Sequence, residues 1–211
     1  MSGGFRFLDL PPGIRNLIYQ ELLVLPEPVV LVLDEDLDLQ TPYPCRTVLW
    51  LALLRANRQI YHEARRILYS QNTFVVGQPV RRCAVLPCFL DCIGPENADH
   101  LRDLHMCVLN LGDAIHQVED EDEVRFADLK ALRRCTNLQT VQDHVLASPR
   151  MGLTVGTYNS ANDEFVRDGL RRIHAILQST PSRPTALISV WDHPFAPQVS
   201  ELMKIFGWEM E

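Results

Sequence analysis

The chain reads, from residue 129 to 141, Leu129-Lys130-Ala131-Leu132-Arg133-Arg134-Cys135-Thr136-Asn137-Leu138-Gln139-Thr140-Val141. Leu129 and Leu132 stand three residues apart, as residues on one face of a helix do. A Cys-x-Asn-Leu turn follows the arginines, and the run ends in residues typical of a buried strand. This stretch therefore predicts a helix up to Arg134, a short turn and a strand over 138–141.

The same alternation of helix and strand extends through most of the chain. Besides 138–141, strands are expected over 29–33, 73–76, 104–109 and 185–191. Helices are expected over 79–93, 119–134, 162–178 and 197–206. Strands separated by helices need crossover connections, which join parallel neighbours. The sequence therefore predicts an α/β fold with a mainly parallel sheet.

Two amphipathic helices are expected in the N-terminal third, the first starting at Pro11-Pro12 and the second running from Thr47 to Tyr69. Proline suits a first helical turn because its missing N–H would have no partner there. Steps of three and four residues predict an apolar face of the first helix formed by Ile14, Leu17, Ile18 and Leu22. Arg15, Asn16 and Gln20 are expected on its opposite, polar face.

The second helix is apolar over more than half of its circumference, so more than one neighbour must cover it. Its remaining strip is basic and is formed by Arg55, Arg58, His62 and Arg65. This strip is either a solvated face or a contact surface for an acidic partner or a phosphate.

Composition limits the class of protein. The 211 residues are 46% apolar and 22% charged with a net charge of −7, which is typical of a globular chain and argues against a surface designed for nucleic acid. The acidic excess belongs to residues 83–211, which carry eleven bases and nineteen acids. Charge-free stretches are far shorter than the ~20 residues that span a bilayer. With no secretory signal at Met1, we expect a protein of the cytoplasm or nucleus with reduced cysteines.

A search for catalytic, metal and cofactor motifs finds little. Phosphate-binding glycine loops, nucleophile elbows and zinc-protease motifs are absent from the sequence. Cys83, Cys88 and Cys92 lack zinc-knuckle spacing and are expected to be small core residues, so neither a metal nor a cofactor is predicted. The remaining catalytic candidates follow two predicted strands, where α/β proteins place active sites. They are Asp143, His144, Asp192 and His193.

Two blocks of the N-terminal third carry a family resemblance. The first spans residues 7–23 and includes Leu10-Pro11-Pro12-Gly13-Ile14-Arg15. The second spans residues 53–74 and includes Asn57-Arg58-Gln59-Ile60-Tyr61-His62-Glu63-Ala64-Arg65. Together they resemble the F-box-like domain of filamentous fungi and the related double Glu-x-Arg domain. Gly13 stands where that family usually has glutamate, Ile60 where F-boxes commonly have tryptophan, and residues 26–44 replace the usual middle helix.

The resemblance implies a non-enzymatic adaptor of a cullin-type ubiquitin ligase. It implies an F-box-like helical module over 1–76, with an insertion at 26–46, and a leucine-rich-repeat-like βα region over 77–211. The module would bind a Skp1-like protein, and the βα region would hold an unknown protein substrate. The partner-binding residues carried over, together with the basic strip, are Leu10, Pro11, Ile14, Leu17, Ile18, Leu22, Leu54, Ala56, Ile60, Arg55, Arg58 and Arg65.

Two alternatives stay open at this point. The helices could pack onto the sheet of a self-contained α/β domain whose role the sequence does not reveal. The chain could instead be a small hydrolase or transferase, provided that Asp143, His144, Asp192 and His193 converge in one pocket.

Overall fold

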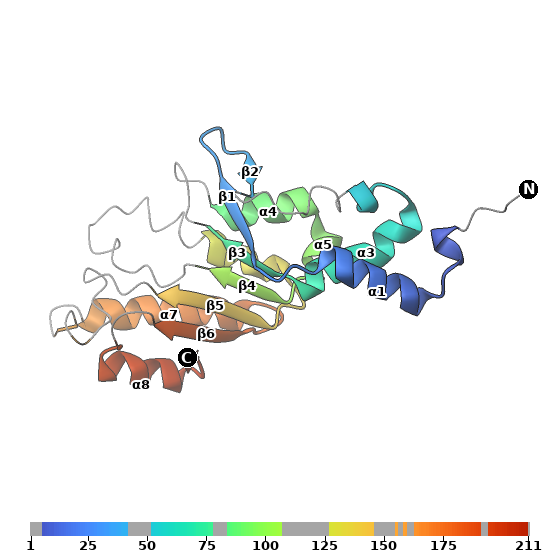
Figure 1. Ribbon diagram of the computed structural model, residues 1–211. Coiled ribbons are helices and arrows are strands. Elements are labelled where there is room, and N and C mark those ends of the chain that lie inside the picture. Colours follow the sequence, from blue (N-terminus) through green and yellow to red (C-terminus); the bar gives the residue numbers. More distant parts are fainter. Residues whose placement is uncertain are drawn as a thin grey trace, which may run out of the picture.

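The computed structural model describes residues 6–41, 52–77, 84–106, 127–145, 155, 158–159, 163–190 and 194–210. Its helices are α1 (Pro12–Leu23), α3 (Arg58–Gln71), α4 (Val85–Ile93), α5 (Pro95–Ala98), α7 (Asp163–Ser179) and α8 (Pro197–Ile205), with 3-10 turns η1 (Phe7–Asp9) and η3 (Leu132–Arg134) (Figure 1). Its strands are β1 (Val29–Leu33), β2 (Leu39–Gln40), β3 (Thr73–Val76), β4 (Asp103–Met106), β5 (Thr140–Val145), β6 (Thr185–Val190) and β7 (Glu209–Met210).

These strands form one sheet in the order β2-β1-β3-β4-β5-β6-β7. Every neighbouring pair is parallel except β1 and β2, which form an antiparallel hairpin. The prediction of an α/β fold with a mainly parallel sheet is therefore confirmed. From β1 to β7 the strand order follows chain order, so every crossover advances in the same direction. Right-handed crossovers in one direction place their helices on one face of the sheet, and α4, α7 and α8 contribute to the main core.

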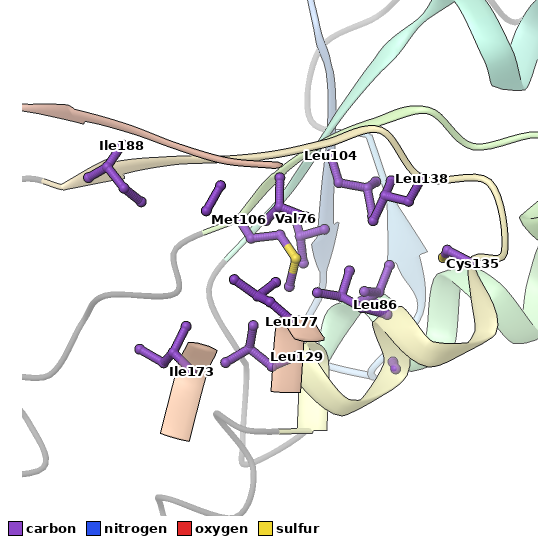
Figure 2. Packing of buried hydrophobic residues seen from close by; sticks show 14 of the residues in the cluster. Val76, Leu86, Leu104, Met106, Leu129, Cys135, Leu138, Ile173, Leu177 and Ile188 are labelled. Atoms are coloured by element: carbon purple, nitrogen blue, oxygen red, sulfur yellow. The ribbon is translucent and has the colours of Figure 1, made fainter. Parts of the chain in front are cut away.

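The burial of the strand residues agrees with this one-sided arrangement. Phe74, Leu104, Val141 and Ala186 are paired in register across four strands, and all of them are buried. They belong to the main core, which also contains residues from α4, η3, α7 and α8. Figure 2 shows Val76, Met106 and Ile188 of the strands on one side of this core and Leu129, Ile173 and Leu177 of the helices on the other.

The second predicted helix, 47–69, differs from the structure. Residues 52–54 are helical, a turn occupies 55–57, and α3 begins afresh at Arg58. Asn57 ends the break because its side chain accepts a hydrogen bond from the Gln59 N–H and caps α3. A single continuous helix was therefore the wrong prediction for this segment, while residues 47–51 lie outside the described part of the chain.

Helix α4 is capped from a distant part of the sequence. The N–H of Leu86 donates to Asp128 Oδ1 over 2.7 Å, since Ala84 at the N-cap provides no side-chain acceptor. Burial raises the pKa of Asp128 to about 6, against the lowering effect of the backbone hydrogen bonds. Asp128 thus joins the helical residues 127–131 to the start of α4.

Candidate functional site

Helices α1 and α3 pair beside the end of the sheet and form a small core of their own (Figure 1). This second core contains Tyr19 and Leu23 from α1 and Ile60, Ala64, Ile67 and Leu68 from α3. The residues that α1 turns toward α3 are Arg15, Tyr19 and Leu23, which stand four residues apart. The expectation that Arg15 lies on the solvent face of α1 is therefore wrong.

An ion pair at the centre of this contact explains the burial of Arg15. Its Nε and Nη2 atoms donate to the two carboxylate oxygens of Glu63 over 2.8 and 2.6 Å. Tyr19 Oη and Gln59 Nε2 also donate to Glu63, at 3.0 and 2.9 Å. The hydrogen bond from Arg15 is the main cause that lowers the pKa of Glu63 to about 2, so the carboxylate stays charged. Burial is the main cause that raises the pKa of Tyr19 to about 12.

Asn72 fixes the other end of the helix pair to the sheet. Its Nδ2 donates to the carbonyl oxygens of Leu23 and Leu68 over 2.7 and 2.8 Å, at the ends of α1 and α3. Its Oδ1 accepts from the Leu25 N–H over 2.8 Å. One buried side chain therefore satisfies backbone groups at the ends of both helices.

Because Arg15, Tyr19 and Leu23 make the internal contact, most apolar residues of α1 point away from α3. Ile14 is 45% exposed and Leu17 58% exposed, and Pro11 at the helix start is exposed as well. Leu10 and Ile18 flank them and are half-buried, whereas Leu22, also half-buried, packs against the α1–α3 core and is removed from the predicted contact. We call Pro11, Ile14 and Leu17, with Leu10 and Ile18, the α1 outer surface. It is an apolar stripe on a helix whose opposite face is already occupied.

The predicted contact residues of the second block have varied environments. Ile60 is buried between α1 and α3, which removes it from any external contact. Leu54 is half-buried, and Ala56, Arg55 and Arg58 are exposed. Arg65 is half-buried: its Nη1 pairs with Glu96 Oε2 over 2.5 Å, and its guanidinium lies 5.1 Å from the centre of the Tyr61 ring. Arg65 of the predicted basic strip is therefore already paired with Glu96 of α5.

The sheet has a second face that the main core does not use. Its central row is formed by Val75, His105, Gln142 and Leu187, which are paired in register and half-buried. A second row is formed by Thr73, Asp103, Thr140 and Thr185, in which the Thr140 hydroxyl donates to Asp103. We call these two rows the outer sheet face. It is polar over β4 and β5, with the apolar residues Val75 of β3 and Leu187 of β6 on either side.

The catalytic hypothesis finds no test in this structure. Asp143 and His144 belong to β5, where their backbones pair with Ile188 and Ser189, but their side chains lie outside what the structure describes. Asp192 and His193 fall outside the described residues altogether. Among the residues that are described, no group of three or more His, Cys, Asp or Glu could hold a metal ion.

The cysteine prediction is corrected in part. Cys88 is half-buried and Cys92 is exposed, so Cys92 is not a core residue. Cys83 lies outside the described part of the chain. In the described residues, none of the helices has the length and apolar character needed to cross a bilayer.

Sequence reasoning missed the ion pair because Arg15 was assigned by polarity to the solvent face. A signal for it was nevertheless present. Tyr19 and Leu23 follow Arg15 at steps of four, and Glu63 is the only acid in a helix with three arginines. Comparison of the chain with family models, with curated proteins and with solved structures finds no match.

Proposed function

We propose that this chain is a non-enzymatic protein-interaction module that binds a Skp1-like adaptor through the α1 outer surface. The observation that carries the proposal is that α1 has apolar residues on both sides. Its inner side is filled by Arg15, Tyr19 and Leu23, yet Ile14 and Leu17 remain largely exposed. Large apolar side chains gathered on one exposed stripe are typical of an interaction site.

The internal contacts of α1 favour recognition by a preformed surface. The paired Arg15 and Glu63 fix the rotation of α1 about its axis, and Asn72 fixes its C-terminal end. A partner would therefore meet Ile14 and Leu17 without ordering the helix first, which lowers the entropic cost of binding. Burying one such side chain contributes about 1.5–3 kcal/mol.

The position of this surface agrees with the F-box resemblance at specific residues. Leu10, Pro11, Ile14 and Leu17 belong to the block that resembles the first docking helix of an F-box. Ile60 belongs to the second block, but its place in the α1–α3 core assigns it a supporting role. We therefore restrict the proposed contact to the α1 outer surface.

The second part of the proposal concerns a protein substrate. We assign it to the outer sheet face, because consecutive helix-strand units with strands in chain order are also the arrangement of leucine-rich repeats. In such an arrangement one row of strand residues faces the ligand, and here that row includes Val75, Gln142 and Leu187.

A binding experiment with the full chain and a purified Skp1-type protein tests the adaptor role. We expect a complex by calorimetry whose dissociation constant rises at least about tenfold in Leu17→Glu, since a charge replaces an apolar contact. Asn16→Glu is the matched control, because Asn16 is exposed on the same helix but lies off the stripe. It should bind as the unchanged chain does. Circular dichroism melts check that both variants fold.

Two results would contradict the adaptor role. One is the lack of a complex with the unchanged chain, and the other is equal binding by Leu17→Glu and Asn16→Glu. Leu187→Arg separates the two surfaces, because it alters the outer sheet face. Leu187→Arg should leave binding of the Skp1-type protein intact. A substrate that co-purifies with the Leu17→Glu variant should fail to co-purify with Leu187→Arg.

A further inference from the structure

The exposed side of α3 carries basic residues that take no part in the contact with α1. Arg58, His62 and Arg66 stand four residues apart and are all exposed. Glu63, the only acid of this helix, is engaged by Arg15, Tyr19 and Gln59. Within the described residues neither Arg58 nor Arg66 has an ion-pair partner.

Basic groups that follow α5 extend this charge. His100 and Arg102 lie in the segment between α5 and β4, close enough to α3 to share its electrostatic field. Burial is the main cause that lowers the pKa of His100, and the positive charges of Arg65, Arg66 and Arg102 lower it further. We call Arg58, His62, Arg66, His100 and Arg102 the basic α3 surface.

Two acids, Glu96 and Asp99, lie beside this surface, and the charge of Asp99 raises the pKa of His100 against the effect of the arginines. Glu96 is held by Arg65, and that contact is the main cause that lowers its pKa. Asp99 Oδ1 accepts the hydroxyl of Thr136 over 2.6 Å. Arg58 and Arg66 themselves make no ion pair within the described residues, in a chain whose overall charge is −7. Such a local field attracts anionic ligands and speeds their association.

The spacing of the charges indicates the shape of the ligand. Residues four apart on a helix rise by about 6 Å, so Arg58, His62 and Arg66 span about 12 Å along α3. In an extended peptide, alternate side chains point to the same side and repeat every ~6.7 Å. Glutamate or aspartate at every second position would therefore match the three basic positions one to one. Arginine binds carboxylates in a bidentate manner, which adds geometric selectivity.

We infer that the basic α3 surface binds an acidic polypeptide segment in an extended conformation, separately from the α1 outer surface. An acidic polypeptide fits better than nucleic acid for two reasons. The chain as a whole carries negative charge, which repels a long polyanion. Within the described residues the strip also has no exposed Phe, Tyr or Trp ring for base stacking, since Tyr61 lies under Arg65 and Tyr69 packs against the core.

Fluorescence anisotropy with the full chain and a labelled peptide of alternating glutamate and serine, about nine residues long, tests this inference. We expect saturable binding that weakens as salt is added, because the contact is electrostatic. Arg58→Glu with Arg66→Glu should raise the dissociation constant at least about tenfold. Lys130→Glu with Arg172→Glu is the matched control, since both side chains are exposed on other helices and the net charge changes equally.

Several outcomes would overturn the inference. One is equal weakening by the two double variants, which would show that net charge alone attracts the peptide. Another is tighter binding of a single-stranded oligonucleotide that displaces the peptide, which would assign the surface to nucleic acid. Leu17→Glu should leave peptide binding unchanged, so failure of the adaptor role and failure of this inference are distinguishable. Circular dichroism confirms that Arg58→Glu with Arg66→Glu retains its helices.

Discussion

Glu63 is the residue on which the contact between α1 and α3 depends. Its carboxylate accepts four hydrogen bonds, two from Arg15 and one each from Tyr19 and Gln59. The guanidinium of Arg15 is buried. Removing the carboxylate charge would leave a buried cation without its counterion, which costs more than the net gain from forming the pair. Arg15 and Glu63 come from the two blocks that carry the F-box resemblance, so the motif has a structural role within this chain.

Glu63→Gln should lower the free energy of unfolding by about 2 kcal/mol at pH 7. Arg15 holds the pKa of Glu63 near 2, below its ordinary value of 4.5, so the carboxylate stabilises the fold above pH 4.5. This contribution is lost as the pH falls from 4.5 through about 2. Urea unfolding at several pH values should therefore show the difference between the variant and the unchanged chain shrinking in acid.

Glu21→Gln is the matched control for that measurement. Glu21 is exposed on α1 and makes no ion pair within the described residues. Its substitution should leave the free energy of unfolding nearly unchanged. A loss of stability in Glu63→Gln that stayed constant down to pH 2 would contradict the assigned role of the charge.

At the level of elements, the backbone of β1 lies close to Gly77, which directly follows β3. Its N–H donates to the carbonyl oxygen of Leu31 over 2.8 Å, and a Cβ at this position would lie 2.6 Å from that oxygen. It would also lie 2.9 Å from Cγ1 of Val32. Glycine is therefore required just after β3, because the two backbones approach too closely for any side chain.

Gly77→Ala should destabilise the protein by about 2 kcal/mol, since a backbone oxygen cannot move aside as a side chain can. Gly13→Ala should instead increase the stability of the protein. A Cβ at Gly13 meets nothing within 4 Å, and alanine in α1 should stabilise by about 0.5–1 kcal/mol. Thermal unfolding of the two variants checks both. Equal melting temperatures would show that the approach of β1 and β3 is not tight.

The whole molecule is built from a continuous sheet with a large core and a smaller helical core beside its end. The large core unites residues from β1 through to Trp208 just before β7, whereas the smaller one depends on α1 and α3. Regions with fewer buried apolar contacts open at lower free energies than the rest of a protein. The α1–α3 pair should therefore open before the central strands.

Native-state hydrogen exchange measures this difference directly. Amides of α1 should exchange through openings of lower free energy than those of β4 and β5, which are paired on both sides. Glu63→Gln should lower the protection of α1 further and leave that of β5 unchanged. Uniform protection of α1 and β5 would instead mean that the two cores open as one unit.

The class of fold and most elements of the sheet region follow from local features of the amino-acid sequence. The strands at 29–33, 73–76 and 185–190 and the helices near 163–179 and 197–205 follow from apolar periodicity and from proline and glycine at their ends. Such signals are local, because each depends on the residues within one element. The small edge strands β2 and β7 carry too few residues to show a pattern.

The side of α1 that faces inward depends instead on contacts between distant parts of the folded chain. Arg15, Tyr19 and Leu23 contact α3 because Glu63, distant in the chain, supplies a carboxylate that makes burial of the guanidinium favourable. Apolar periodicity instead favoured Ile14 and Leu17, which remain exposed. The burial of a charged group depends on its partner, and pairing between distant residues is a property of the folded chain rather than of any single segment.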